Sequence, residues 1–344
     1  MPQWSVYTGN SEPHDGIVRL PEPPPWRAFD GAPVVPAPGH ADDEAAVSPD
    51  RIHRARAYVA TPESVQLVNA ALVLRRPLLV TGPPGTGKSS LAYAVARELQ
   101  LGPVLRWNIT SRSTLADGLY QYDPLSRLYA ARQRAWGRDQ EPLRSDVEDH
   151  LRLGPLGTAL LPYERPRVLL VDEIDKSDLD LPNDLLNVLE EGQYEIPELL
   201  RSARHSAQGD DDTAEVLADG ADTPVAVTRG RVRCRAFPFV VLTSNGEREF
   251  PPAFLRRCVR LQLLRPDRTQ LTEIVHAHLG TPADAAEPLI ERFLDRAKGG
   301  ELATDQLLNA IYLTGVAGLD AESRDAMAEQ LMPYLSATAD GDGF

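Results

Sequence analysis

Residues 78–90 read LLVTGPPGTGKSS and combine an apolar run, a glycine-rich turn and the start of a helical pattern. The apolar run at 78–80 is typical of a buried parallel strand. The turn at 82–89 matches every position of the pattern G-x-x-x-x-G-K-[ST]. A helix is predicted to begin near Lys88, because apolar residues then share one helical face at Leu91, Val95 and Leu99. A strand, this turn and a helix in that order predict a phosphate-binding loop.

The residue types of this loop suit a nucleoside triphosphate. Glycines let backbone N–H groups converge on phosphate oxygens, and the helix start adds its positive dipole end. Lys88 is expected to reach the β- and γ-phosphates, and the Ser89 hydroxyl to ligate Mg²⁺. The sequence therefore predicts ATP and Mg²⁺ as ligands. The predicted nucleotide-binding residues are Gly82, Pro83, Pro84, Gly85, Thr86, Gly87, Lys88, Ser89 and Ser90.

Three more apolar runs, at 104–107, 168–171 and 239–243, predict further strands. Strands that alternate with helices favour an α/β fold, with a parallel sheet covered by helices on both faces. Asp172 and Glu173 directly follow the second of these runs, at the carboxyl edge where such sheets bind ligands. Asp172 is predicted to contact Mg²⁺, and Glu173 to orient and deprotonate the attacking water.

Polar residues after the 239–243 run complete the predicted site. Asn245 can bond the γ-phosphate or the water, although an Asn at the end of a strand is otherwise a common turn former. Arg256 and Arg257 follow, and one of them, Arg257 before Arg256, is predicted to reach the γ-phosphate of a neighbouring subunit as an arginine finger. The alternative is a pair of surface arginines. Asp175 and Lys176 are assigned to the surface.

Composition limits the class of protein. The chain has 344 residues, 42% of them hydrophobic, and contains no apolar run long enough to span a membrane. Its first residues lack the pattern of a secretory signal. With only two cysteines, Cys234 and Cys258, free thiols and a cytoplasmic location are predicted. The net charge of −14 disfavours a nucleic-acid partner.

Changes in composition divide the chain into three parts. Residues 1–50 are rich in proline and acidic residues and are expected to form a disordered tail, with partner docking as the alternative. Residues 51–264 carry the strands and the motifs, with an acidic stretch at 202–223 that is interpreted as an inserted loop; calcium binding there is the alternative to a solvated loop. Residues 265–344 show helical periodicity alone and predict a small all-helical lid domain.

The order of these motifs resembles the MoxR-like branch of AAA+ ATPases, in the dynein-related group, over residues 51–335. Residues 114–124 (TLADGLYQYDP) and the later GPL at 154–156 resemble the insertion of that branch. The sequence DEIDK at 172–176 leads into LLNVLEEGQ at 185–193, which is similar to the segment before its hairpin, and residues 228–236 resemble the return strand of that hairpin.

The resemblance implies a homo-oligomeric ring, usually a hexamer, with ATP between subunits. It implies chaperone-like remodelling of a protein client, often one with a von Willebrand factor A domain, and a restraint on Glu173 by Asn108. The lid departs from the pattern, because Asp305 occupies the position where an arginine is expected; Arg292 or Arg296 are the substitutes. Two alternatives therefore stay open: a nucleotide-dependent scaffold or switch with little turnover, and a nucleic-acid-directed motor.

Overall fold

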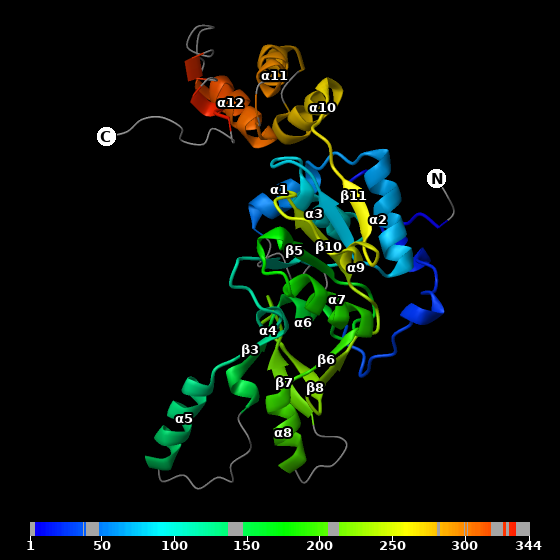
Figure 1. Ribbon diagram of the computed structural model, residues 1–344, viewed down its shortest axis with the longest axis vertical. Helices are drawn as coiled ribbons and strands as arrows, with labels where there is room; N and C mark the ends of the chain where they lie inside the picture. Colours follow the sequence, from blue (N-terminus) through cyan, green and yellow to red (C-terminus); the bar gives the residue numbers. More distant parts are fainter. Residues whose placement is uncertain are drawn as a thin grey trace.

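The computed structural model describes residues 4–36, 38, 48–136, 147–205, 213–280, 283–298, 300, 302–317, 326–327 and 330–334. Its centre is a parallel sheet of five strands in the order β11-β1-β10-β5-β2. The strands are β1 (Leu78–Thr81), β2 (Leu105–Asn108), β5 (Val168–Asp172), β10 (Phe239–Ser244) and β11 (Val259–Gln262). The α/β fold class predicted from the sequence is confirmed (Figure 1).

The edge strand β11 has no counterpart among the predicted strands. It is four residues long and alternates exposed and covered side chains, with Leu261 buried and Arg260 exposed. Such a short alternating segment lacks the continuous apolar run by which the buried central strands were identified. Its pairing with β1 places it in the sheet: Leu78 lies opposite Val259, and Thr81 opposite Gln262.

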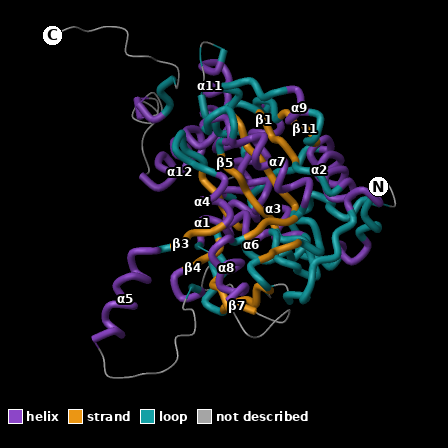
Figure 2. The backbone as a smooth tube through the Cα atoms, turned by 60° about the horizontal axis from the view of Figure 1, so that its bottom comes forward, coloured by secondary structure: helices purple, strands orange, loops and turns teal. Residues whose placement is uncertain are grey.

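Two apolar layers cover the two faces of the sheet because successive strand residues point to opposite sides. Leu79, Val171 and Leu242 belong to one buried cluster, while Val80, Leu170 and Val241 belong to the other. Helices α2 (Pro62–Leu74) and α3 (Lys88–Glu98) contribute to the second cluster, and α6 (Pro155–Ala159) and α7 (Leu181–Glu191) to the first. Helices therefore lie on both sides of the strands (Figure 2).

A smaller sheet lies beside this core, in the order β3-β4-β7-β8. Its strands are β3 (Tyr120–Tyr122), β4 (Leu151–Leu153), β7 (Thr213–Leu217) and β8 (Pro224–Thr228). The hairpin β7–β8 corrects the interpretation of 202–223 as a loop, because residues 213–217 form a strand; the aspartates at 210–212 lie outside the described residues. A separate pair, β6 (Gln193–Glu195) and β9 (Arg231–Arg233), matches the predicted return strand.

Short helices and turns precede or connect these strands. They are α1 (Pro49–Arg56), α4 (Leu115–Leu119), α8 (Pro197–His205), α9 (Pro252–Leu255) and the 3₁₀ turns at Gly16–Arg19, Pro25–Arg27, Glu148–His150 and Ile174–Lys176. Helix α5 (Pro124–Trp136) stands away from both sheets in two views (Figures 1 and 2). Its exposed side chains include Leu125, Leu128 and Tyr129.

Past β11 the described residues form only helices, as predicted. Helices α10 (Arg268–Leu279), α11 (Ala283–Ala297) and α12 (Thr304–Ala317) enclose a third buried cluster that includes Leu271, Ile290 and Leu307. This group lies beyond the carboxyl edge of the main sheet (Figure 1). It touches the phosphate-binding loop, since a side chain at Gly85 would come within 2.7 Å of the backbone nitrogen of Thr304.

The N-terminal residues 4–36, which we name the N-terminal strap, do not form the disordered tail that was expected. Val6, Tyr7 and Ile17 are buried in the same cluster as α2 and α3. The Asn69 side chain accepts hydrogen bonds from the backbone N–H groups of Val6 and Tyr7. The proline-rich composition concealed these few apolar anchors, whose burial and hydrogen bonds offset the entropy of ordering the chain.

Glu98, at the end of α3, accepts several further hydrogen bonds from the strap. Its carboxylate is fully buried and binds the N–H groups of Thr8, Gly9 and Ser11, the Thr8 hydroxyl and the His14 ring. We expect Glu98→Ala to lower the free energy of unfolding by roughly 2–4 kcal/mol, because several donors to a charged acceptor lose their partner together. Chemical denaturation measures this loss, and tryptic cleavage at the exposed Arg19 should accelerate.

The exposed Glu191 provides the matched control, since Glu191→Ala removes the same charge from the surface. An unchanged denaturation midpoint for Glu98→Ala would contradict the anchoring role of Glu98.

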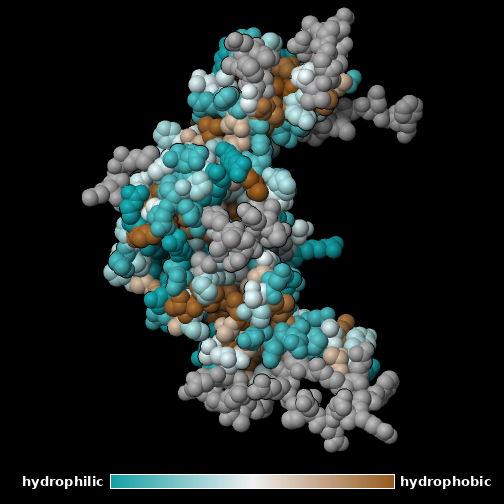
Figure 3. Space-filling view, turned by 180° about the vertical axis from the view of Figure 1, so that it is seen from behind, coloured by the Kyte–Doolittle hydropathy of each residue, from teal (hydrophilic) through white to brown (hydrophobic). Residues whose placement is uncertain are grey.

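On the face seen from behind, hydrophilic residues dominate the middle of the molecule, and hydrophobic residues gather in small separate patches (Figure 3).

Within the described residues, no helix has the length and apolar character that crossing a membrane requires. Cys234 and Cys258 are buried free thiols, as predicted.

Candidate active site

The predicted phosphate-binding loop lies between β1 and α3, at the carboxyl edge of the sheet. Gly85 and Gly87 have φ angles of 75° and 81°, in the left-handed region that glycine adopts without strain. A side chain at Gly82 would collide with the backbone oxygen of Leu263, at 2.3 Å, where β11 ends. The loop therefore requires glycines for its turns and for its close contact with the neighbouring strand.

Lys88 is the cation of this loop. Its ammonium group donates to the carbonyl oxygens of Gly82 and Pro83, at 2.8 Å each, and is largely buried. Burial lowers the pKa of Lys88, while the negative charges of Asp175, Asp172 and Glu173 oppose that shift. An ammonium group bonded only to neutral carbonyls and surrounded by carboxylates can exchange those carbonyls for phosphate oxygens when a nucleotide binds.

The carboxylate of Asp172, at the end of β5, accepts hydrogen bonds from residues of β2, of β10 and of the phosphate-binding loop. Its Oδ1 accepts hydrogen bonds from the hydroxyl groups of Ser89 and Thr243, at 2.7 Å each. Its Oδ2 accepts one from the Arg106 guanidinium on β2, at 2.8 Å. Burial raises the pKa of Asp172, but these hydrogen bonds and the positive charge of Arg106 outweigh burial, so the net shift is downward. The carboxylate is therefore ionised at neutral pH.

Arg106 is a site residue that sequence reasoning missed. It lies in register opposite Leu170, two positions before the pair of Asn108 and Asp172. Its long side chain therefore reaches along the strands to the carboxylate of Asp172. An arginine inside an apolar strand, Val104-Leu105-Arg106-Trp107, was the available signal. A charged residue in such a run requires a partner, and a carboxylate on the adjacent strand is the simplest one.

The ion pair leads to a prediction about metal dependence. Because Arg106 binds the carboxylate of Asp172, the predicted Mg²⁺ ligand, we expect Arg106→Gln to lower the Mg²⁺ concentration needed for half-maximal ATP hydrolysis. A partly exposed pair contributes about 1 kcal/mol, which corresponds to roughly a fivefold change. A Mg²⁺ titration of the steady-state rate measures it, with Arg201→Gln on α8 as the control. A higher Mg²⁺ requirement in Arg106→Gln would instead show that the arginine holds Asp172 in place.

Glu173 follows Asp172 in an unusual conformation. Its φ angle is 62°, which is costly for a residue with a side chain, and its N–H donates to the Thr243 hydroxyl at 2.9 Å. The carboxylate accepts a hydrogen bond from Lys176 at 2.7 Å. Among the described contacts, Lys176, and not Asn108, restrains this carboxylate. The surface assignment of Lys176 thus omitted a role beside the predicted base.

The surface prediction is wrong for Asp175, whereas Lys176 is exposed, as predicted. The carboxylate of Asp175 is 3% exposed, and its Oδ2 accepts hydrogen bonds from the Ser244 hydroxyl and from the N–H groups of Asn245 and Glu247. These bonds attach the loop after β10 to the turn after β5. Asn245 is therefore at the same edge as Glu173, as predicted, with its side-chain amide 3.5 Å from Glu247.

Arg256 and Arg257 lie at the opposite edge of the sheet from the loop of their own chain. They precede β11, which runs parallel to β1, and only the far end of β11 reaches Gly82. Four strand residues separate the two edges by roughly 13 Å. Neither arginine can therefore join the site that Lys88 and Asp172 form within the same chain.

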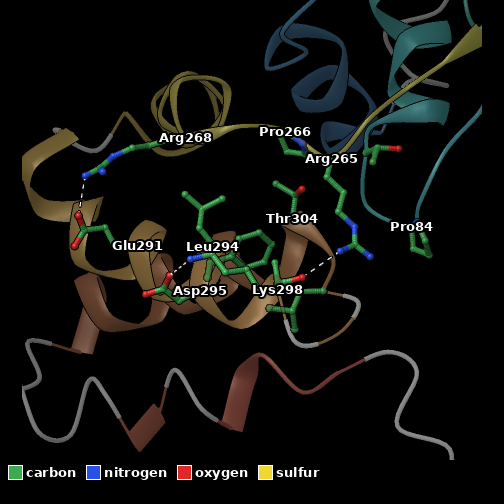
Figure 4. Close-up of a pocket in the computed structure, with 13 residues that line it drawn as sticks. Pro84, Arg265, Pro266, Arg268, Glu291, Leu294, Asp295, Lys298 and Thr304 are labelled. Atoms are coloured by element: carbon green, nitrogen blue, oxygen red, sulfur yellow. Dashed lines mark hydrogen bonds and ion pairs between the residues drawn. The ribbon is translucent and has the colours of Figure 1, made fainter.

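A cleft of about 670 Å³ is lined by residues of the loop and of the lid. Pro84 and Thr86 line one side, and the positively charged residues around it are Arg265, Arg268 and Lys298, not Arg292 or Arg296. Arg265 extends from the linker toward α11, where it donates to the oxygen of Ala297 (Figure 4). Asp305 is exposed, and Arg296 donates to the oxygen of Met332 within the lid.

The residues at this edge fit a magnesium ion. Ser89 and Asp172 supply a hydroxyl and an ionised carboxylate that already lie within hydrogen-bond distance of each other, and Mg²⁺ prefers such oxygen ligands. No group of three or more His, Cys, Asp or Glu side chains that could hold a metal ion occurs in the described part of the chain.

Comparison with known proteins adds one finding. A family model described as an AAA domain of the dynein-related subfamily matches residues 77–258, which include the loop, both central carboxylates and both arginines. No curated protein matches the sequence.

Proposed function

Because this chain belongs to the dynein-related subfamily of the AAA domain family, we propose that it binds Mg-ATP and hydrolyses it at the interfaces of a homo-oligomeric ring. The observation that carries the proposal is the convergence on Asp172. Ser89 from the loop and Thr243 from β10 bond one oxygen of a carboxylate that stands beside Glu173. A purely structural glycine turn has no need for this arrangement.

The loop and its lysine would hold the triphosphate. Backbone N–H groups of residues 84–89 and the start of α3 favour anionic oxygens, and Lys88 would transfer its hydrogen bonds from the loop carbonyls to the phosphates. Ser89 and Asp172 would hold Mg²⁺. When bound, the ion would neutralise charge on the β- and γ-phosphates.

Glu173 would supply the base. It would accept a proton from a water that attacks the γ-phosphorus, while Asn245 would orient the water or the phosphate. The bond between the γ-phosphorus and the bridging oxygen would break, giving ADP and inorganic phosphate. The hydrogen bond with Lys176 would have to loosen during this step, since an ion-paired carboxylate is a poorer base.

The position of the two arginines supports the proposal of a ring. Because Arg256 and Arg257 stand at the edge opposite their own loop, a role at a γ-phosphate requires a second subunit. We extend the proposal to a hexameric ring that remodels a protein client such as a von Willebrand factor A domain protein. That extension rests on the resemblance of the motifs to the MoxR-like branch.

Calorimetry with ATP and Mg²⁺, together with phosphate release, tests the central proposal. We expect binding in the micromolar range or tighter, and phosphate release that stops when EDTA removes Mg²⁺ and returns when Mg²⁺ is restored. Folded protein that produces no heat with Mg-ATP would overturn the proposal.

A second candidate, a nucleotide-dependent switch with little turnover, is favoured by one observation. Asp305 is exposed at the start of α12, where the family pattern has an arginine. ATP-dependent assembly seen by light scattering, without phosphate release, would favour the switch over the hydrolase.

A further inference from the structure

Arg257 is held within its own chain by a specific contact. Its Nε lies 2.6 Å from Oε1 of Glu190, in the last turn of α7, and its Nη1 lies 3.4 Å from the backbone oxygen of Ala253. The arginine side chain is 30% exposed and that of Glu190 is 42% exposed. Glu190 thus covers the Nε side of the Arg257 guanidinium, and the rest of the group is accessible to solvent.

This contact leaves most of the guanidinium available. A guanidinium carries five N–H donors in a planar fork, and the bond to Glu190 uses one of them. Within the described residues, no acceptor binds Nη2 of Arg257. A side chain held through Nε and open at Nη2 is restricted in direction and can still donate to an oxygen of another molecule.

The N-terminal strap supports the helix end from which Glu190 acts. Arg27 is 8% exposed and donates through Nη1 to the backbone oxygen of Glu190 and through Nη2 to that of Leu189. These carbonyls belong to the last turn of α7, where a helix lacks partners of its own and a cation is favourable. Its Nε and Nη2 also donate to the oxygen of Arg75, at the end of α2.

Aromatic rings fix the direction of Arg27. Its guanidinium lies over Phe237, 4.5 Å from the ring centroid, and over Phe29, at 5.5 Å. The three residues Arg27, Glu190 and Arg257, which we name the finger support, therefore form a continuous path from the N-terminal strap to the arginine. Arg256 is tied to the same region, because its backbone oxygen accepts a hydrogen bond from Arg76 at 3.0 Å.

We propose that Glu190 is the positioning residue for Arg257 when this arginine acts on the nucleotide of a neighbouring subunit, and that Arg27 of the N-terminal strap fixes Glu190. The inference rests on the proposed hydrolysis at subunit interfaces. The strap lies outside residues 77–258, which the family model matches. It would thus affect the rate of hydrolysis at a site that it does not contact.

Mixing two inactive variants tests this inference. Lys88→Ala has a defective nucleotide site and an intact arginine, whereas Arg257→Ala has an intact nucleotide site and lacks the arginine. In mixed rings, the arginine of the first should act on the nucleotide of the second and restore phosphate release. We then add Glu190→Gln either to the arginine donor, Lys88→Ala, or to the acceptor, Arg257→Ala.

Glu190→Gln in the donor is expected to lower the restored kcat about 10-fold, since a small displacement of a catalytic group has an effect of this order or larger. The same substitution in the acceptor should leave the restored rate unchanged, and KM for ATP should not change in either mixture. Arg27→Ala in the donor should act in the same direction, and Glu191→Gln, at the neighbouring position, should have no effect.

The outcomes separate this inference from the proposed function. Equal losses with Glu190→Gln in donor and acceptor would show a purely structural role and overturn the inference, as would full activity of the Glu190→Gln donor. If the unmodified protein hydrolyses ATP but the two variants never complement each other, Arg257 does not act between subunits and the inference falls while hydrolysis stands. A protein without any hydrolysis would overturn the proposed function itself.

Discussion

Replacing Glu173 with glutamine is expected to leave ATP binding intact and to lower kcat by at least about 100-fold, because a general base contributes 10²–10⁴-fold. Glutamine keeps the length of the side chain and can still accept a hydrogen bond from Lys176, but it cannot take a proton from water. The backbone contact of Glu173 with Thr243 does not involve the side chain, so the φ angle of 62° should persist. Phosphate release under saturating Mg-ATP measures the loss, and calorimetry measures the retained affinity.

A matched control comes from Glu195→Gln, which removes one carboxylate from β6, where Glu195 pairs with Arg231. We expect this variant to hydrolyse ATP at the parent rate. Parent-like turnover in Glu173→Gln would show that another group activates the water, and Asp175, a buried carboxylate two positions further on, would then be tested.

The second large effect that we expect is a loss of nucleotide affinity in Lys88→Ala. Removal of the ammonium group takes away charge-assisted hydrogen bonds to phosphate and removes a positive charge that lies near the carboxylates of Asp172, Asp175 and Glu173. Loss of one partner from a buried charge pair costs about 2–5 kcal/mol, so the dissociation constant for Mg-ATP should rise by at least about 30-fold. Titration calorimetry measures the change directly.

Arg201→Ala on α8 removes one positive charge without contact with the loop and serves as the control for Lys88→Ala. A thermal melt should confirm that the Lys88→Ala variant is folded, since its ammonium group bonds only loop carbonyls. Unchanged affinity for Mg-ATP in this folded variant would place the triphosphate elsewhere.

Several elements could be predicted because their information is local. The loop at 82–89 depends on glycines and a lysine at fixed positions in one segment, and buried strands such as β5 and β10 are continuous apolar runs. The strand ends then placed Asp172, Glu173 and Asn245 at one edge, because parallel strands align their carboxyl ends. Edge strand β11 escaped this reasoning, since four alternating residues carry little signal.

Other features depended on pairing between distant segments. Nothing in the local pattern around Arg106 shows that it meets Asp172, 66 positions later. The composition of the N-terminal strap predicted disorder, yet Glu98 and Asn69 bind its backbone. Asp175 is predicted to lie at the surface, but it is buried against donors from the end of β10 and from the loop that follows.

The sequence alone thus determined the chemistry of the loop and of the carboxylates at the strand ends, because each resides in a short segment whose backbone geometry follows from its own residues. Tertiary structure decided which cation meets which carboxylate, including Arg106 with Asp172 and Arg257 with Glu190. Long side chains are attracted to any opposite charge within reach, so only the packing of strands and helices selects the partner.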